Sequence, residues 1–169
     1  MHALCLFVEQ GEKAFMRYEG TVETLGEILS HQGGEQNLFY TVSHIKSSAL
    51  PRELGVPWKM KIPDFERTEY LAFDIDGIQE TQDVHDLEHV MEEWLKKIGE
   101  PIGERHYIAS GHGMHILLRI PEQRSIDFFK FYASKYKAAC LLLYAELFKT
   151  GITCKQVDPS IFEPSRLLR

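Results

Sequence analysis

The sequence predicts an α+β fold with a mixed sheet flanked by helices, and three observations lead to this fold class. Short runs of alternating or continuous apolar residues predict five strands: Leu38–Val42, Tyr70–Asp76, His106–Ala109, Met114–Ile120 and Lys155–Asp158. Apolar residues at helical spacing predict three helices: residues 21–30, 83–98 and 125–149. Hairpin-like turns between strands favour this class over a doubly wound sheet.

The helices are supported by their apolar faces and by their ends. Residues 21–30 bring four apolar side chains onto one face: Val22, Leu25, Ile28 and Leu29. Residues 83–98 carry apolar residues on one side and acidic residues on the other, and Gly99 stands where a helix stop belongs. Gly151 in the same way ends the helix at 125–149.

Composition indicates one domain spanning residues 1–169. A chain of 169 residues with 44% hydrophobic content can bury one sizeable core, and is short for two. It has no run of ~18 apolar residues and no signal peptide, so we expect a cytoplasmic protein with no membrane partner. The three cysteines form no C-x-x-C pair, so neither a disulfide framework nor a zinc site is expected. A net charge of −6 disfavours bulk electrostatic binding of nucleic acid and leaves only local binding.

The strand Tyr70–Asp76 sets two acids on one face. Alternation places Leu71, Phe73 and Ile75 on one side of the strand, and Ala72, Asp74 and Asp76 on the other. Carboxylates two residues apart on a strand can converge on divalent ions such as Mg²⁺. Acids that precede a glycine, here Gly77, are also common turn chemistry, so the motif alone is not decisive.

The segment Ser110–His115 (SGHGMH) suggests a phosphate cradle. Gly111 and Gly113 allow a sharp turn that presents backbone N–H groups to an anion, and the Ser110 hydroxyl can also donate. His115 lies on the following strand, where it can contact a phosphate oxygen. The alternative is an ordinary glycine-rich hairpin turn with incidental histidines.

The third group of residues is Val157–Asp158 with Arg166 and Arg169 behind it. Asp158 offers a further carboxylate, and the two guanidinium groups can pair with phosphates. A strand that runs into a turn is the plain alternative for V-D-P.

The ordered combination LAFDID, SGHGMH and VD resembles the three motifs of the archaeo-eukaryotic primase superfamily, in its phage and plasmid type. The resemblance covers residues 38–169. It implies an RRM-like catalytic sheet flanked by helices, as in primase-polymerase cores. The ending SRLLR resembles the start of the family's closing segment, so the catalytic core is expected to continue beyond Arg169.

The resemblance also implies a role for each motif residue. Two Mg²⁺ or Mn²⁺ ions would be held by the catalytic acids Asp74, Asp76 and Asp158. The nucleotide phosphates would be bound by six residues: Ser110, Gly111, Gly113, His115, Arg166 and Arg169. The expected partners are NTP or dNTP, a single-stranded or primed DNA template, and other replication proteins such as a helicase domain.

These observations together predict a DNA primase or polymerase that transfers nucleotides to a 3′-hydroxyl. Two alternatives remain. A two-metal phosphoesterase or nuclease uses the same acids but has no use for a triphosphate cradle. A non-catalytic DNA-binding replication module would keep the acids only as a relic.

Overall fold

The computed structural model describes residues 3–9, 13–20, 37–49, 61–78, 84–99, 103–164 and 168. The chain divides into two compact units. The first comprises residues 1–69, 122–128 and 163–169, and the second comprises residues 70–121 and 129–162. Within the described residues, no helix is long and apolar enough to cross a membrane.

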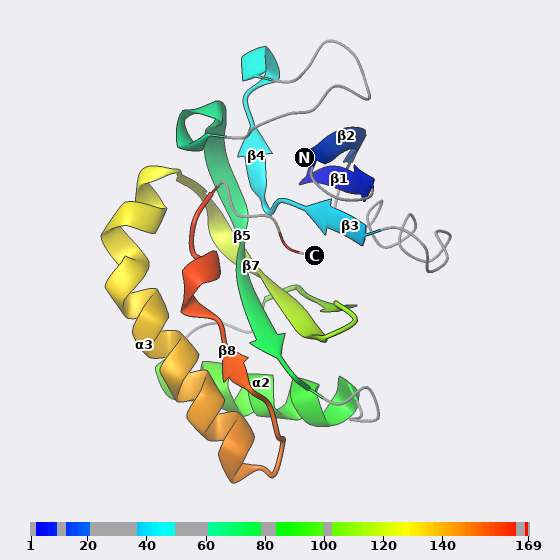
Figure 1. Cartoon of the computed structure of the whole chain (residues 1–169). Helices are drawn as coiled ribbons and strands as arrows, with labels where there is room; N and C mark the ends of the chain where they lie inside the picture. The colour runs from blue at the N-terminus through cyan, green and yellow to red at the C-terminus, as the bar shows by residue number, and fades with distance from the viewer. Residues whose placement is uncertain are drawn as a thin grey trace. The chain divides into compact units, whose positions relative to one another are not determined.

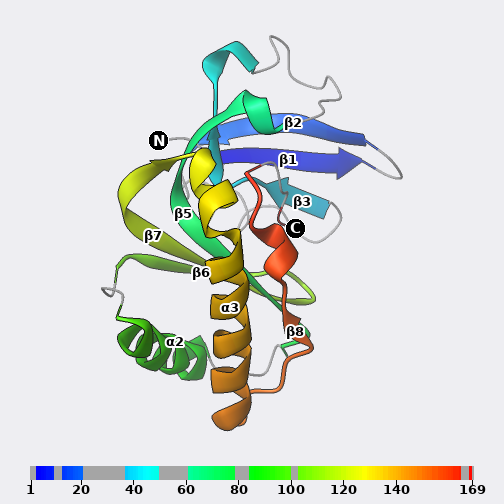
Figure 2. The same ribbon diagram turned by 90° about the vertical axis from the view of Figure 1, so that its left-hand side faces the viewer.

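The first unit contains a three-stranded antiparallel sheet in the order β2-β1-β3. Its strands are β1 (Ala3–Glu9), β2 (Lys13–Gly20) and β3 (Asn37–Tyr40). Figure 2 shows β1 and β2 as neighbouring antiparallel arrows. The strand predicted at Leu38–Val42 overlaps β3, but the β1 and β2 strands were not predicted.

Further contacts of the first unit involve β4 (Ser43–Ile45) and the beginning of β5 (Phe65–Asp76), which pair antiparallel. Two backbone hydrogen bonds, of 2.8 and 2.9 Å, join Tyr40 to Leu168. Two short 3₁₀ helices, η1 (Ser47–Ala49) and η2 (Ile62–Asp64), also belong to this unit.

The second unit is built on the rest of β5 and three further strands (Figure 1). β7 (Gly113–Ser125) lies beside β5, β6 (Arg105–Ala109) pairs antiparallel with β7, and β8 (Gln156–Val157) pairs antiparallel with the end of β5. The sheet in the order β4-β5-β7-β6 and the helices packed on it confirm the α+β class. The sheet is antiparallel, so the predicted mixed sheet is wrong.

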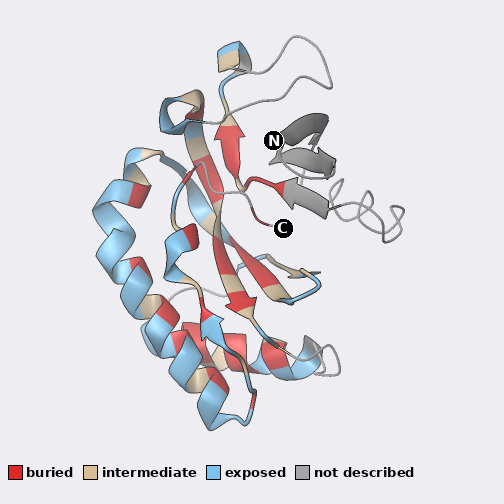
Figure 3. Ribbon diagram, in the orientation of Figure 1, coloured by how far each residue is buried: buried red, intermediate tan, exposed pale blue. Residues whose placement is uncertain are grey.

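Two helices pack on one face of this sheet: α2 (Val84–Ile98) and α3 (Asp127–Lys149). Phe73 of β5 meets both, with its ring 5.3 Å from Trp94 of α2 and 5.2 Å from Tyr136 of α3. The Tyr136 hydroxyl also donates a 2.7 Å hydrogen bond to the backbone oxygen of Ala72. Figure 3 shows the resulting run of buried residues along β5.

The predicted helix ends agree with the observed ones. α2 stops before Gly99, and α3 is followed by Gly151, both with positive φ (75° and 82°). That conformation ends a helix with little strain only where there is no Cβ. The helix predicted at residues 21–30 lies outside the described residues.

Candidate functional site

Asp74 and Asp76 occupy the face of β5 opposite to its apolar core residues. Phe73 and Ile75 are fully buried, whereas Asp74 and Asp76 are intermediate in exposure, as the alternation predicted. The Asp74 side chain is 19% exposed. The acids therefore lie at the partly accessible face of the sheet, away from Trp94.

The register of β8 brings Asp158 directly opposite Asp74. Ile75 pairs with Val157, so the next residues outward, Asp74 and Asp158, form the following cross-strand pair. The Asp158 N–H donates to the Asp74 carbonyl oxygen at 2.8 Å. Directly opposed residues in an antiparallel pair have Cβ atoms roughly 4.5–5.5 Å apart on the same face. Acids 84 positions apart in the sequence (158 − 74) thus become neighbours.

The Ser110–Gly113 turn lies against the same end of β5. It is a two-residue hairpin connection in which the Ser110 N–H donates to the Gly113 carbonyl at 3.0 Å and Gly111 has φ +78°. A positive φ at the first central position is what a type II′ hairpin turn requires. The Gly77 N–H donates to the His112 carbonyl at 2.7 Å, which ties the tip of the turn to the residue after Asp76.

Gly113 is required by close backbone contact rather than by its φ. A Cβ atom at this position would overlap the Ile75 carbonyl oxygen and lie 3.1 Å from Asp76 Cα. Any side chain would therefore push the turn away from the acids. Gly111 and His112, by contrast, are exposed at the tip, where a ligand can reach the backbone.

His115 lies two residues beyond this turn and faces Asp74. It is only 2% exposed, and its Nε2 atom is 3.5 Å from Asp74 Oδ1. Burial lowers the pKa of His115 to about 4, against the opposing attraction of the Asp76 carboxylate. The imidazole is therefore neutral at pH 7, so it can donate one hydrogen bond but adds no positive charge.

Two polar residues that sequence reasoning missed hold the acids in place. The Gln156 Nε2 amide donates to Asp76 Oδ2 at 2.7 Å. Ser160 binds both oxygens of Asp158, with its N–H 2.8 Å from Oδ1 and its hydroxyl 2.8 Å from Oδ2. The second contact had a readable signal, because D-P-S is the pattern of an acid that caps a short helix, here η3 (Pro159–Ile161). The contact of Gln156 with Asp76 depends on the register of β8, and no local sequence pattern indicated it.

The donor chemistry of the acids fits a hard divalent ion, since carboxylate oxygens are the ligands that Mg²⁺ and Mn²⁺ prefer. The hydrogen bonds of Asp76 and Asp158 leave further lone pairs on both carboxylates. Among the residues that the structure describes, no group of three or more histidines, cysteines or acids is arranged to hold a metal ion.

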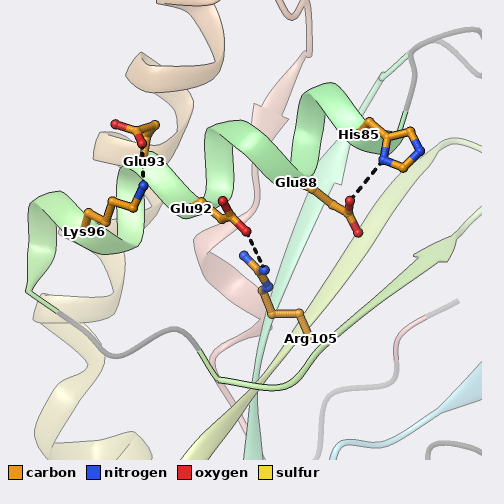
Figure 4. A network of polar contacts seen from close by, with 6 residues as sticks. All are labelled: His85, Glu88, Glu92, Glu93, Lys96 and Arg105. Atoms are coloured by element: carbon orange, nitrogen blue, oxygen red, sulfur yellow. Dashed lines mark hydrogen bonds and ion pairs between the residues drawn. The ribbon is translucent and has the colours of Figure 1, made fainter.

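The acidic face of α2 is separate from this group and is engaged in contacts of its own (Figure 4). Glu92 pairs with Arg105 of β6 at 3.0 Å, and Glu93 pairs with Lys96 at 2.8 Å. Figure 4 also shows His85 beside Glu88, 3.3 Å apart. These pairs account for the polar side of the amphipathic pattern and add nothing to the candidate site.

Arg166 and Arg169, the two predicted phosphate ligands of the C-terminal segment, lie outside the described residues. The other seven predicted residues all belong to the second unit: Asp74, Asp76, Ser110, Gly111, Gly113, His115 and Asp158. Comparison with protein-family models, with curated proteins and with solved structures finds no match for this chain.

Proposed function

We propose that the chain is the catalytic core of a primase-polymerase type nucleotidyltransferase, which transfers nucleotides from NTP or dNTP to a 3′-hydroxyl on a DNA template. One observation carries the proposal. The β8 register brings Asp158 opposite Asp74, and the glycine turn at Ser110–Gly113 lies at the same strand end. A glycine turn alone, or a pair of acids alone, is common in proteins. Nucleotidyl transfer requires phosphate-binding backbone and metal-binding acids close together, and both lie at the same end of β5.

In this function Asp74, Asp76 and Asp158 hold Mg²⁺ or Mn²⁺. The ions, when bound, would neutralise the triphosphate and activate the attacking hydroxyl. The acids would repel a triphosphate on their own, so nucleotide binding should depend strictly on the cation. The Ser160 hydroxyl can stay on Asp158 Oδ2 when an ion binds, because a carboxylate oxygen has a second lone pair, and it would then orient the acid.

The turn residues supply the other half of the site. Exposed backbone at Gly111 and His112, together with the Ser110 hydroxyl, can donate hydrogen bonds to phosphate oxygens. His115 is neutral and contacts Asp74, so it orients that acid in the free protein. The predicted contact of His115 with a phosphate oxygen would require this side chain, which is 2% exposed in the free protein, to become accessible when the nucleotide binds.

A second candidate function is a non-catalytic DNA-binding module with a relic site. The hydrogen bonds of Gln156 to Asp76 and of Ser160 to Asp158 favour it, because they satisfy the acids without any metal. In that case the acids serve only the local structure of β8 and η3. Their removal would then change stability and no activity.

Primer extension separates these functions. The purified chain is incubated with a 5′-labelled primer on a DNA template, MnCl₂ or MgCl₂, and all NTPs or all dNTPs. We expect extension by the unmodified protein and none by Asp74→Asn or Asp158→Asn. Glu66→Gln is the matched control, because Glu66 is an exposed acid near the other end of β5, and it should extend normally.

The alternatives give different results in the same assay. Shortening of the primer without any nucleotide would identify a nuclease. Lack of extension together with no Mn²⁺-dependent heat of NTP binding in calorimetry would identify the relic. Equal extension by Asp158→Asn and the unmodified protein would overturn the assignment of the acids.

A further inference from the structure

Helix α3 has two apolar faces, and only one of them is buried. The inner face packs on the sheet through five residues: Phe129, Tyr136, Cys140, Leu143 and Leu147. On the outer face four large apolar side chains are strongly exposed: Phe131 (72%), Leu141 (63%), Leu142 (55%) and Phe148 (76%). In Figure 3 most of the outer side of α3 has the colour of exposed residues. A surface helix normally carries polar residues there.

The exposed residues form a continuous stripe. At about 100° per residue, an arc of roughly 100° on the side opposite to the buried face holds Asp127, Lys130 and Lys149 at the two ends of the helix. Between them, the same arc holds six exposed residues that are apolar or small. We call them the outer stripe: Phe131, Ser134, Ala138, Leu141, Ala145 and Phe148. Leu142 extends its edge. The stripe runs nearly the full length of α3, with phenylalanines at its two ends and Leu141 near its middle.

The stripe is self-complementary when two copies are placed antiparallel. With a two-fold axis between residues 139 and 140, Phe131 of one copy lies at the same level as Phe148 of the other, at opposite edges of the contact, and Ala138 faces Leu141. Ser134 and Ala145 also face each other, so small residues on either side of the central Ala138–Leu141 contact allow the helices to approach closely. A two-fold interface must match each residue with its counterpart in this way.

The area agrees with a dimer. Taking ~200 Å² for a fully exposed large side chain, the four large residues expose on the order of 500 Å² per copy. Two copies would bury about 1,000 Å² in total, which is where specific interfaces begin. Monomeric proteins seldom leave a contiguous apolar patch larger than a few hundred Å².

We infer that the outer stripe of α3 is a homodimer interface, in which a second copy of this chain packs antiparallel against it. The interface is independent of the nucleotide site and of its proposed function. At its two ends Lys130 of one copy comes opposite Lys149 of the other. Salt screens that repulsion and strengthens apolar contact, so the dimer should tighten as the salt concentration rises.

Sedimentation equilibrium of the whole chain tests the interface. We expect a monomer–dimer equilibrium, and Leu141→Lys should weaken it about 100-fold or more, since two-fold symmetry introduces the change twice. Ile62→Lys is the matched control, because Ile62 is an exposed apolar residue (48%) outside α3, and its dimer constant should be unchanged. Circular dichroism and the melting temperature confirm that both variants are folded.

A mixing experiment tests the antiparallel register. Ala138→Glu and Leu141→Lys should each be mainly monomeric, whereas their mixture should form a heterodimer because the introduced charges face each other. A monomeric unmodified protein at about 200 µM would overturn the inference. So would a dimer that Leu141→Lys leaves intact. Two folded variants that do not associate on mixing would overturn the proposed register.

Discussion

The Asp74→Asn variant distinguishes two roles of this acid: binding of a cation, or stabilisation of the local structure. Asp158 lies directly opposite Asp74, and Asp76 is two residues away on the same face. Like charges directly opposed on a sheet destabilise it by roughly 0.2–1 kcal/mol. The Asp74→Asn change removes that repulsion, and the new amide oxygen can still accept a hydrogen bond from His115 Nε2.

We therefore expect Asp74→Asn to raise the free energy of unfolding by about 0.5–1 kcal/mol without metal. For a chain of this length that corresponds to a rise of roughly 1–4 °C in melting temperature. Mn²⁺ should stabilise the unmodified protein by mass action, by about 2.7 kcal/mol at a concentration 100 times its dissociation constant. The asparagine variant should gain much less.

The assay is thermal unfolding followed by circular dichroism, with and without MnCl₂, beside Glu66→Gln as control. Glu66 is an exposed acid on the same strand and pairs only loosely with Arg67, at 4.0 Å. Its removal should change stability by less than about 0.5 kcal/mol under either condition. A clear fall in the melting temperature of Asp74→Asn without metal, with no effect of Mn²⁺ on the unmodified protein, would refute the reasoning.

Three further predictions concern the elements around the acids. Gly113→Ala should destabilise the protein by about 1–3 kcal/mol or more through overlap with β5, whereas Gly111→Ala should cost only the ~1–2 kcal/mol of a strained φ, both measured by urea unfolding. Tyr136→Phe should cost about 1–2 kcal/mol in the same assay, since the buried carbonyl of Ala72 loses its donor. Burial raises the pKa of the Cys140 thiol from 9.0 to about 11, so the thiol ionises first in the unfolded chain. The stability that it contributes is fully present below pH 9 and is lost as pH rises to about 11, and Cys140→Ala should flatten that part of a stability profile against pH.

The helices could be predicted from the sequence because their signals are local. The apolar period of residues 83–98 and the glycine behind it fix α2 to within one residue of Val84–Ile98. The first half of β5 was missed because its pattern is inverted there: Thr68 and Glu69 are buried, and His44 lies 3.4 Å from the Glu69 carboxylate. A strand that buries polar residues cannot be recognised by counting apolar ones.

In the candidate site, too, local sequence patterns predict part of the arrangement, and contacts between residues far apart in the sequence determine the rest. Alternation along one strand sufficed to put Asp74 and Asp76 on the same face. Whether Asp158 joins them depends on the register of a two-residue strand, and a slip of one residue would turn its side chain to the other face. Backbone hydrogen bonds on both sides of β8 hold that register, because the N–H groups of Lys155 and Asp158 donate to the carbonyl oxygens of Asp76 and Asp74. A further bond, from the Gly77 N–H to the His112 carbonyl, ties the end of β5 to the turn tip. The backbone at Gly113 packs closely against Ile75 and Asp76 of β5, so the position of the turn and the positions of the acids depend on each other. A substitution that loosens the turn should therefore disturb the pairing of Asp158 with Asp74 even though neither acid is changed.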